Sequence, residues 1–175
     1  YSEYPGLNDY QCLKKLIETI QAPYAVYAAD DDFLIPEGLE KSIAFLESHP
    51  DYSSAHGSAC MFSLGNSGPY GKICALWGYD LPVLNQDRAC ERLVEHMGHY
   101  TVALFCVHRT GTWKRMFQNT VVFDRSFAGE ILPCCLSVIY GKTAKIEGLY
   151  LVRHVHDRNY RLPDVFDWIT SPGWS

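Results

Sequence analysis

Three consecutive aspartates, Asp30, Asp31 and Asp32, follow a short apolar run in the segment APYAVYAADDDFLIPEGL at residues 22–39. Side chains alternate along an extended chain, so Asp30 and Asp32 are expected on one face, about 6.6 Å apart. Carboxylates this close repel one another, and a bound cation removes the repulsion. Mg²⁺ or Mn²⁺ completes its shell with water and diphosphate oxygens. The run therefore predicts a cation site for a diphosphate-containing substrate, with a solvated turn before a helix as the alternative.

A second candidate group is the segment RHVHDRNY at residues 153–160. His154 and His156 are two positions apart, so they face the same side if the chain is extended, and neutral imidazole is a suitable ligand for Mn²⁺. Asp157 can orient the ring of His156. An ordinary surface role is the alternative for each histidine. Three arginines of this region can make bidentate contacts to phosphate: Arg153, Arg158 and Arg161.

The elements that must position these residues alternate between strands and helices. A helix is predicted from Asn8 or Asp9 to before Pro23, and the apolar run 24–29 is expected to be a strand buried on both faces, as in parallel sheets. Pro36 starts a helix that His49-Pro50 ends. Further strands are predicted at 52–62, 102–107 and 144–152, and further helices at 87–97, 112–118 and 127–140. This order indicates one domain over residues 1–175 of α/β class, with a mixed sheet flanked by helices; a mixed α+β sheet is the alternative.

Composition narrows the classes of function. The net charge of -5 and a pI of about 5.8 provide no basic field for nucleic acid, and we expect no nucleic-acid partner. No apolar window is long enough for a membrane span. The seven cysteines form no CxxC pair, which favours reduced, mostly buried thiols and a cytoplasmic location. Because the chain begins with Tyr1, we expect a fragment of a longer protein.

The segment AVYAADDDFLIPEGLEKSIAFLESHPDYSSAHG resembles the metal-binding segment of A-type glycosyltransferases (GT-A fold), especially the family-two-like group. The resemblance implies a nucleotide-sugar donor, a carbohydrate or other hydroxyl acceptor, and Mn²⁺ or Mg²⁺ bound at an Asp-x-Asp motif. It implies Asp32 as the direct metal ligand, and Asp30 at the ribose or a metal-bound water. Asp31 lies between them at the donor site. His154 and His156 would complete the metal shell, and Arg158 would bind the donor.

The same resemblance implies a catalytic base at the start of a later helix. Glu130, in SFAGEILPCCLSVIYGK, is the candidate that would deprotonate the acceptor hydroxyl in an inverting reaction. Ile131 follows it where the family commonly has an aspartate. Asp124 is the alternative base, and Glu130 could instead be a first-turn acid that interacts with the helix dipole. The family's N-terminal nucleotide-binding strand-helix-strand is not found ahead of Tyr1, which implies an N-terminally truncated GT-A fold.

Other polar and aromatic residues receive simpler interpretations. Trp77, with Tyr79 and Asp80, is a candidate for the acceptor side, because aromatic faces suit the C–H face of a sugar. Four further histidines lack such companions and are interpreted as structural: His56, His96, His99 and His108. We further expect that Asp32→Ala abolishes metal-dependent binding and leaves the fold intact.

Three other functions compete with the glycosyltransferase hypothesis. A sugar nucleotidyltransferase would need a glycine-rich phosphate loop near the N-terminus, and none is visible. A non-catalytic metal- or carbohydrate-binding module would use Asp30 and Asp32 without a role for Glu130. An aspartyl-phosphate receiver would need acids after two different strands, whereas these three are contiguous.

Overall fold

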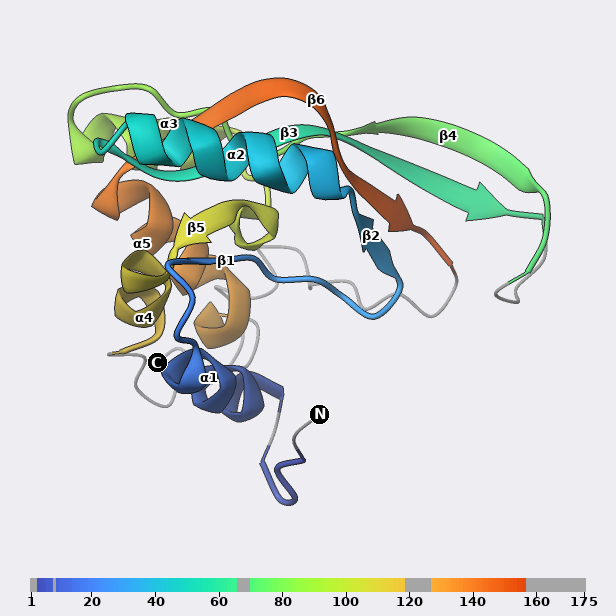
Figure 1. Cartoon of the computed structure of the whole chain (residues 1–175), viewed down its shortest axis with the longest axis horizontal. Coiled ribbons are helices and arrows are strands. Elements are labelled where there is room, and N and C mark those ends of the chain that lie inside the picture. The colour runs from blue at the N-terminus through green and yellow to red at the C-terminus, as the bar shows by residue number, and fades with distance from the viewer. Residues whose placement is uncertain (1–2, 8, 66–69, 119–126, 157–175) are drawn as a thin grey trace.

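The computed structural model describes residues 3–7, 9–65, 70–118 and 127–156. A six-stranded sheet runs through them in the order β1-β5-β3-β6-β2, with β4 paired to β3 (Figure 1). Its strands are β1 Tyr24–Ala25, β2 Asp32–Leu34, β3 Tyr52–Leu64, β4 Ile73–Tyr79, β5 Val107–Arg109 and β6 Lys142–His154. The two long strands β3 and β6 are parallel, and the remaining pairs are antiparallel. The sheet is therefore mixed.

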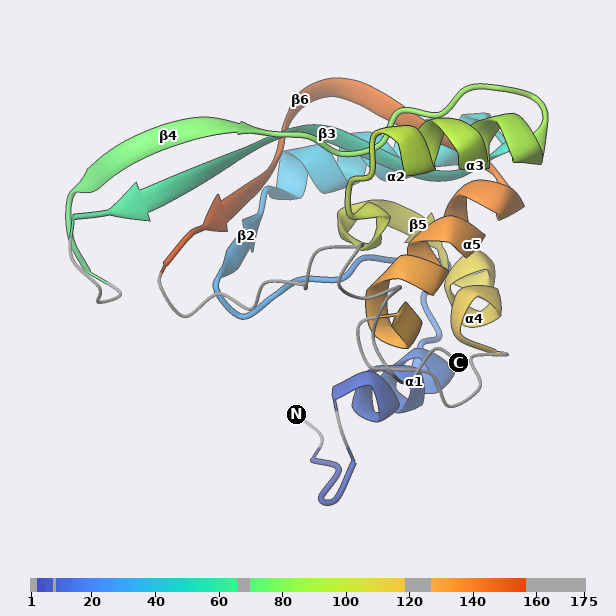
Figure 2. The ribbon, with the colours of Figure 1, turned by 180° about the vertical axis from the view of Figure 1, so that it is seen from behind.

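The helices flank this sheet. They are α1 Asp9–Thr19, α2 Pro36–Ser48, α3 Ala89–Gly98, α4 Thr110–Gln118 and α5 Leu132–Tyr140, with a 3₁₀ turn at Ala103–Phe105 and a π-helical turn at Phe127–Ile131. Figure 1 shows α2 lying along β3 and β6, and the reverse view in Figure 2 shows α3 in front, above α5. The β3–β4 hairpin extends away from the helices in both views.

The predicted α/β class with a mixed sheet and flanking helices is confirmed, and two of the predicted strands need correction. The run 24–29 contributes only the two-residue β1, which pairs antiparallel with β5 at the end of the sheet order and is not a buried parallel strand. Of the predicted strand 102–107, residues Ala103–Phe105 form the 3₁₀ turn instead, and only Val107, which pairs with Ala55, belongs to a strand, β5. Strand β4 was not predicted.

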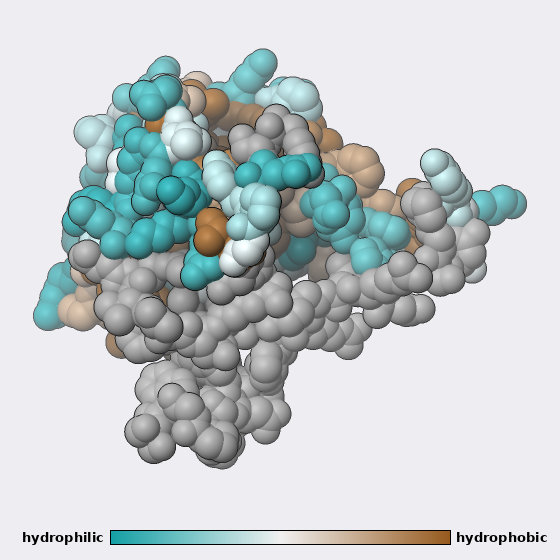
Figure 3. Space-filling view, turned by 90° about the horizontal axis from the view of Figure 1, so that it is seen from below, coloured by the Kyte–Doolittle hydropathy of each residue, from teal (hydrophilic) through white to brown (hydrophobic). Residues whose placement is uncertain are grey.

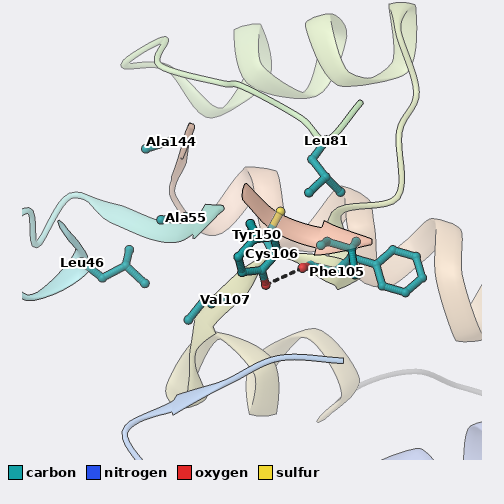
Figure 4. Close-up of a cluster of buried hydrophobic side chains, with 9 residues drawn as sticks. Leu46, Ala55, Leu81, Phe105, Cys106, Val107, Ala144 and Tyr150 are labelled. Carbon is teal, nitrogen blue, oxygen red and sulfur yellow. Dashed lines mark hydrogen bonds between the residues drawn. The ribbon is translucent and has the colours of Figure 1, made fainter. Parts of the chain in front are cut away.

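The core has two parts. In the first, Leu46 of α2 packs with Ala55 of β3, Leu151 of β6 and the turn before β5, and the Tyr150 hydroxyl donates to the Phe105 carbonyl at 2.7 Å (Figure 4). In the second, α1, α4 and α5 meet through apolar side chains: Ile17, Trp113, Met116, Phe117 and Cys134. Each fully buried apolar side chain contributes about 1.5–3 kcal/mol by removal from water.

A glycine lets α2 lie very close to β6. A Cβ added to Gly38 would lie 2.5 Å from the Leu149 carbonyl oxygen and 2.8 Å from the Tyr150 Cα, both backbone atoms. In β6, Gly148 has a φ of 114°, which other residues rarely adopt. These two positions fix α2 against β6, the strand that carries Arg153.

The cysteines agree only in part with the expectation of reduced, mostly buried thiols. All seven cysteines are free thiols, but only Cys106 and Cys134 are buried, whereas Cys74 and Cys90 are exposed. The expectation of mostly buried thiols is therefore wrong.

On the face shown in Figure 3 the described residues are mainly hydrophilic. Within the described ranges, no helix is long and apolar enough to cross a membrane.

Candidate active site

The three aspartates lie in the connection between β1 and β2. Strand β1 ends at Ala25, residues 26–29 follow without regular pairing, and a turn at Asp30 and Asp31 leads into β2. Asp32 is the first residue of β2 and stands opposite Arg153 in β6. The aspartates therefore precede a short antiparallel strand, and the expected buried strand does not run up to them. The Asp30 side chain is exposed, whereas Asp31 and Asp32 are partly buried residues.

Asp32 points into the protein. Its side chain is 0% exposed, and its Oδ2 accepts a hydrogen bond of 2.9 Å from Nε of Arg153. Burial raises the pKa of Asp32, and the Arg153 charge opposes that rise. The guanidinium carbon of Arg153 lies 4.1 Å from the ring centroid of Phe105 and 4.9 Å from that of Tyr79. The other oxygen, Asp32 Oδ1, is buried and has no hydrogen-bond partner among the described residues.

Asp31 faces a histidine from the end of the last strand. His156 Nε2 lies 2.9 Å from Asp31 Oδ2, and both side chains are about a quarter exposed. The ring of His154 stacks on Phe62 with centroids 4.9 Å apart, and its centroid lies 5.1 Å from that of His156. The fold therefore brings Asp31 and both candidate histidines together, although 125 residues separate Asp31 from His156 in the sequence.

The donor atoms here suit a divalent cation that takes most of its ligands from elsewhere. A carboxylate oxygen of Asp31 and an imidazole nitrogen of His156 are in contact, and the next residue in sequence, Asp32, has a buried carboxylate oxygen that no described residue pairs. Within the described ranges, no three His, Cys, Asp or Glu side chains are arranged to hold a metal ion. A cation bound by one or two protein groups, with water and diphosphate oxygens as its other ligands, needs no such triad.

Glu130 lies in the π-helical turn immediately before α5. Its Oε1 accepts a hydrogen bond of 3.1 Å from the Tyr100 hydroxyl. Burial raises the pKa of Glu130 above its usual range, whereas the Tyr100 hydrogen bond and the Arg153 charge lower it. Asp32 and Glu130 thus both interact electrostatically with Arg153. The alternative base, Asp124, lies outside the described residues, as do Asp157, Arg158 and Arg161.

Arg153 has a position that the sequence did not reveal. It was predicted to bind phosphate, yet its nearest carboxylate is Asp32, and its guanidinium lies against two aromatic rings. Tyr79, a candidate for the acceptor side, is one of these rings, while Trp77 is 38% exposed on β4. The contact depends on the pairing of β2 with β6, and no short-range signal in the sequence specifies that pairing.

Two of the histidines interpreted as structural make internal hydrogen bonds. His56 Nε2 lies 3.0 Å from the Pro82 carbonyl oxygen, and His108 Nε2 lies 2.8 Å from that of Ala103. His96 is equally buried but makes no hydrogen bond within the described part of the chain, and His99 is exposed.

Comparison with known proteins adds no family to this description. No protein-family model matches the chain, and no curated protein is significantly similar to it.

Proposed function

We propose that the chain is a domain of a metal-dependent glycosyltransferase that moves a sugar from a nucleotide-diphospho-sugar to a hydroxyl acceptor with inversion. One observation carries the proposal. Asp32, the first residue of β2, and Glu130, in the turn before α5, lie about 100 residues apart in sequence, and the charge of Arg153 near the end of β6 acts on both carboxylates by opposing the rise in their pKa values. This arrangement supports an active site that contains both the donor-binding residues and the catalytic base.

Each acidic residue has its own role in the proposal. Asp31 and His156 hold Mn²⁺ or Mg²⁺, which when bound neutralises the charge that develops on the departing diphosphate. Asp32 positions Arg153 and offers Oδ1 to the cation or to one of its waters. Asp30, which is exposed in the turn, is directed to the ribose. Asp31 replaces Asp32 as the first choice of metal ligand, because Asp32 is occupied by Arg153.

Glu130 is the proposed base. Its carboxylate takes the proton from the acceptor hydroxyl while that oxygen attacks the anomeric carbon and the diphosphate departs. A raised pKa makes the carboxylate a stronger base at neutral pH, and the Tyr100 hydroxyl fixes its orientation. In a non-catalytic binding module, Glu130 would have no such role.

Calorimetric titration with UDP and GDP tests the donor site, with Mn²⁺ present and again with EDTA. We expect binding that requires Mn²⁺ and that falls at least tenfold in Asp31→Asn, because a charged ligand becomes neutral. Glu47→Gln, an exposed acid on α2, is the matched control and should bind normally. Equal binding with EDTA, or equal binding by Asp31→Asn, would contradict the metal site.

Glu130→Gln separates catalysis from binding. Because the base is not a donor ligand, this variant should bind UDP or GDP with Mn²⁺ as the parent does. Its rate of sugar release from the nucleotide-sugar that binds should fall by about 10²–10⁴-fold, the usual contribution of general base catalysis. An unchanged rate would exclude Glu130 as the base and favour a binding module or another carboxylate.

A further inference from the structure

A small cavity between α3 and residues 80–84 contains polar atoms that no described residue pairs. Its volume is about 200 Å³, and Asp80, Glu95, His96 and Thr101 are among its lining residues. His96 is 1% exposed, and neither of its ring nitrogens makes a hydrogen bond to a described residue. The Thr101 hydroxyl is also buried, with no partner in the described part of the chain. Three buried polar atoms therefore belong to residues that line one cavity.

These atoms specify the kind of group that fits. Burial lowers the pKa of His96 to about 4, so its ring is neutral near pH 7, with one nitrogen donating and the other accepting. A hydroxyl group of a ligand can donate to one such atom and accept from another. Asp80 and Glu95 are exposed residues that can accept hydrogen bonds from further hydroxyls, while Leu81 and Leu84 offer apolar contact.

The walls of the cavity are held in place by contacts that do not involve a ligand. The buried Arg92 of α3 donates to the carbonyls of Val138 at 2.7 Å, Ile139 at 3.0 Å and Gln86 at 2.7 Å. The segment opposite is fixed by Leu84, which exchanges backbone hydrogen bonds with Thr143. The site is therefore preformed, which reduces the entropy lost on binding.

We propose that this cavity binds a single carbohydrate ring through its hydroxyl groups. Its volume is below the range of about 300–1,000 Å³ of pockets for drug-sized ligands, which suits one ring rather than an oligosaccharide. The His96 ring lies 5.1 Å from that of Tyr100, whose hydroxyl donates to Glu130. The sugar ring bound in the cavity is therefore the acceptor or the terminal unit of the acceptor. This acceptor role rests on the proposed function, whereas the binding of a sugar does not.

The test follows the ring nitrogens of His96 by NMR in ¹⁵N-labelled protein during titration with glucose, galactose and N-acetylglucosamine. We expect saturable shifts of the His96 signals with at least one sugar. Thr101→Val removes the hydroxyl at nearly constant shape and should weaken this binding roughly tenfold, while Thr101→Ser retains the hydroxyl and should bind like the parent. His96→Phe should abolish binding and remain folded, because it removes nitrogens that no group of the described residues pairs.

Absence of saturable His96 shifts with all three sugars would overturn the proposal and leave ordered water as the partner of these atoms. Equal affinity of Thr101→Val and Thr101→Ser would overturn it too. The two proposals fail in different ways. Sugar binding at His96 without Mn²⁺-dependent UDP or GDP binding would support the carbohydrate site and contradict the transferase, and the reverse result would contradict only the cavity.

Discussion

Arg153 is the residue on which the candidate site depends most. It pairs with a carboxylate that is wholly buried, and its guanidinium lies against Phe105 and Tyr79. A buried ion pair is not a large source of net stability, but removing one partner leaves the other charge without compensation. The side chain of Arg153 is 21% exposed, so water relieves only part of that cost.

Asp32→Ala should therefore lower the free energy of unfolding by about 3 kcal/mol, contrary to the expectation that it leaves the fold intact. The double variant Asp32→Ala/Arg153→Met should recover a large part of that loss, because it removes both charges. Urea unfolding of the parent, the two single variants and the double variant measures the coupling. Purely additive losses would show that the pair does not matter to stability.

At this scale the sequence predicted partners better than it predicted roles. The spacing of His154 and His156 correctly predicted two imidazoles close together, whereas only Asp30 and Asp31 of the acidic run lie in a turn and Asp32 begins β2. Which aspartate faces inward could not be predicted, because that depends on a three-residue strand whose partner lies 121 residues away. Whether a metal binds there stays a prediction.

Among the elements, α2 makes a contact that leaves no room for a side chain. Its third residue, Gly38, is buried against the backbone of β6, and a methyl group there would meet two backbone atoms closer than 3.0 Å. A backbone cannot rotate out of the way as a flexible side chain can. The helix would have to move away from β6, and that displacement would reach the Asp32–Arg153 pair through β2.

Gly38→Ala should destabilise the protein by roughly 1–3 kcal/mol, the usual cost of overpacking. Gly111→Ala is the matched control. Gly111 lies in α4, is exposed, and has no atom near the position of an added Cβ, so alanine there should stabilise by roughly 0.5–1 kcal/mol. Thermal unfolding of the two variants should give shifts of opposite sign. A neutral Gly38→Ala would mean that α2 and β6 can separate without loss.

Helices and long strands were the elements that local sequence specified well. Pro36, as predicted, is the first residue of α2, and β3 and β6 cover the two longest predicted strands. The errors occur where strand pairing, and not local sequence, determines the secondary structure. Residues 26–29 have strand-forming composition but no ladder partner, and Cys106 donates to Ala103 in a 3₁₀ turn where a strand was predicted. Such outcomes depend on tertiary contacts that propensity does not contain.

The whole molecule carries an unusual set of buried imidazoles. Burial lowers the pKa of both His96 and His108 to about 4 from 6.5, and it lowers that of His56 too. Above pH 6.5 these rings are neutral in both the folded and the unfolded state. Below it, the unfolded chain takes up protons that the native protein excludes, at His96 and His108 until about pH 4. The histidines therefore make stability fall as the pH decreases through this window.

Two carboxyls act in the opposite direction. Burial raises the pKa values of Asp32 and Glu130, so at acidic pH the native state binds their protons before the unfolded chain does. That uptake stabilises the native state as the pH falls and offsets part of the histidine effect. Since His96 and His108 are each shifted from 6.5 to about 4, we expect the loss of stability to dominate between these two values.

One variant separates the contribution of His96 to the pH dependence of stability from the contributions of the other groups. His96→Phe lacks one titrating ring, so the decrease in its unfolding free energy with falling pH should be shallower than that of the parent by up to about 1.4 kcal/mol per pH unit. Urea unfolding at several pH values from 7 down to 4 measures the two slopes. Parallel curves would mean that His96 titrates alike in the folded and unfolded chains, and that water reaches its ring freely in the native state.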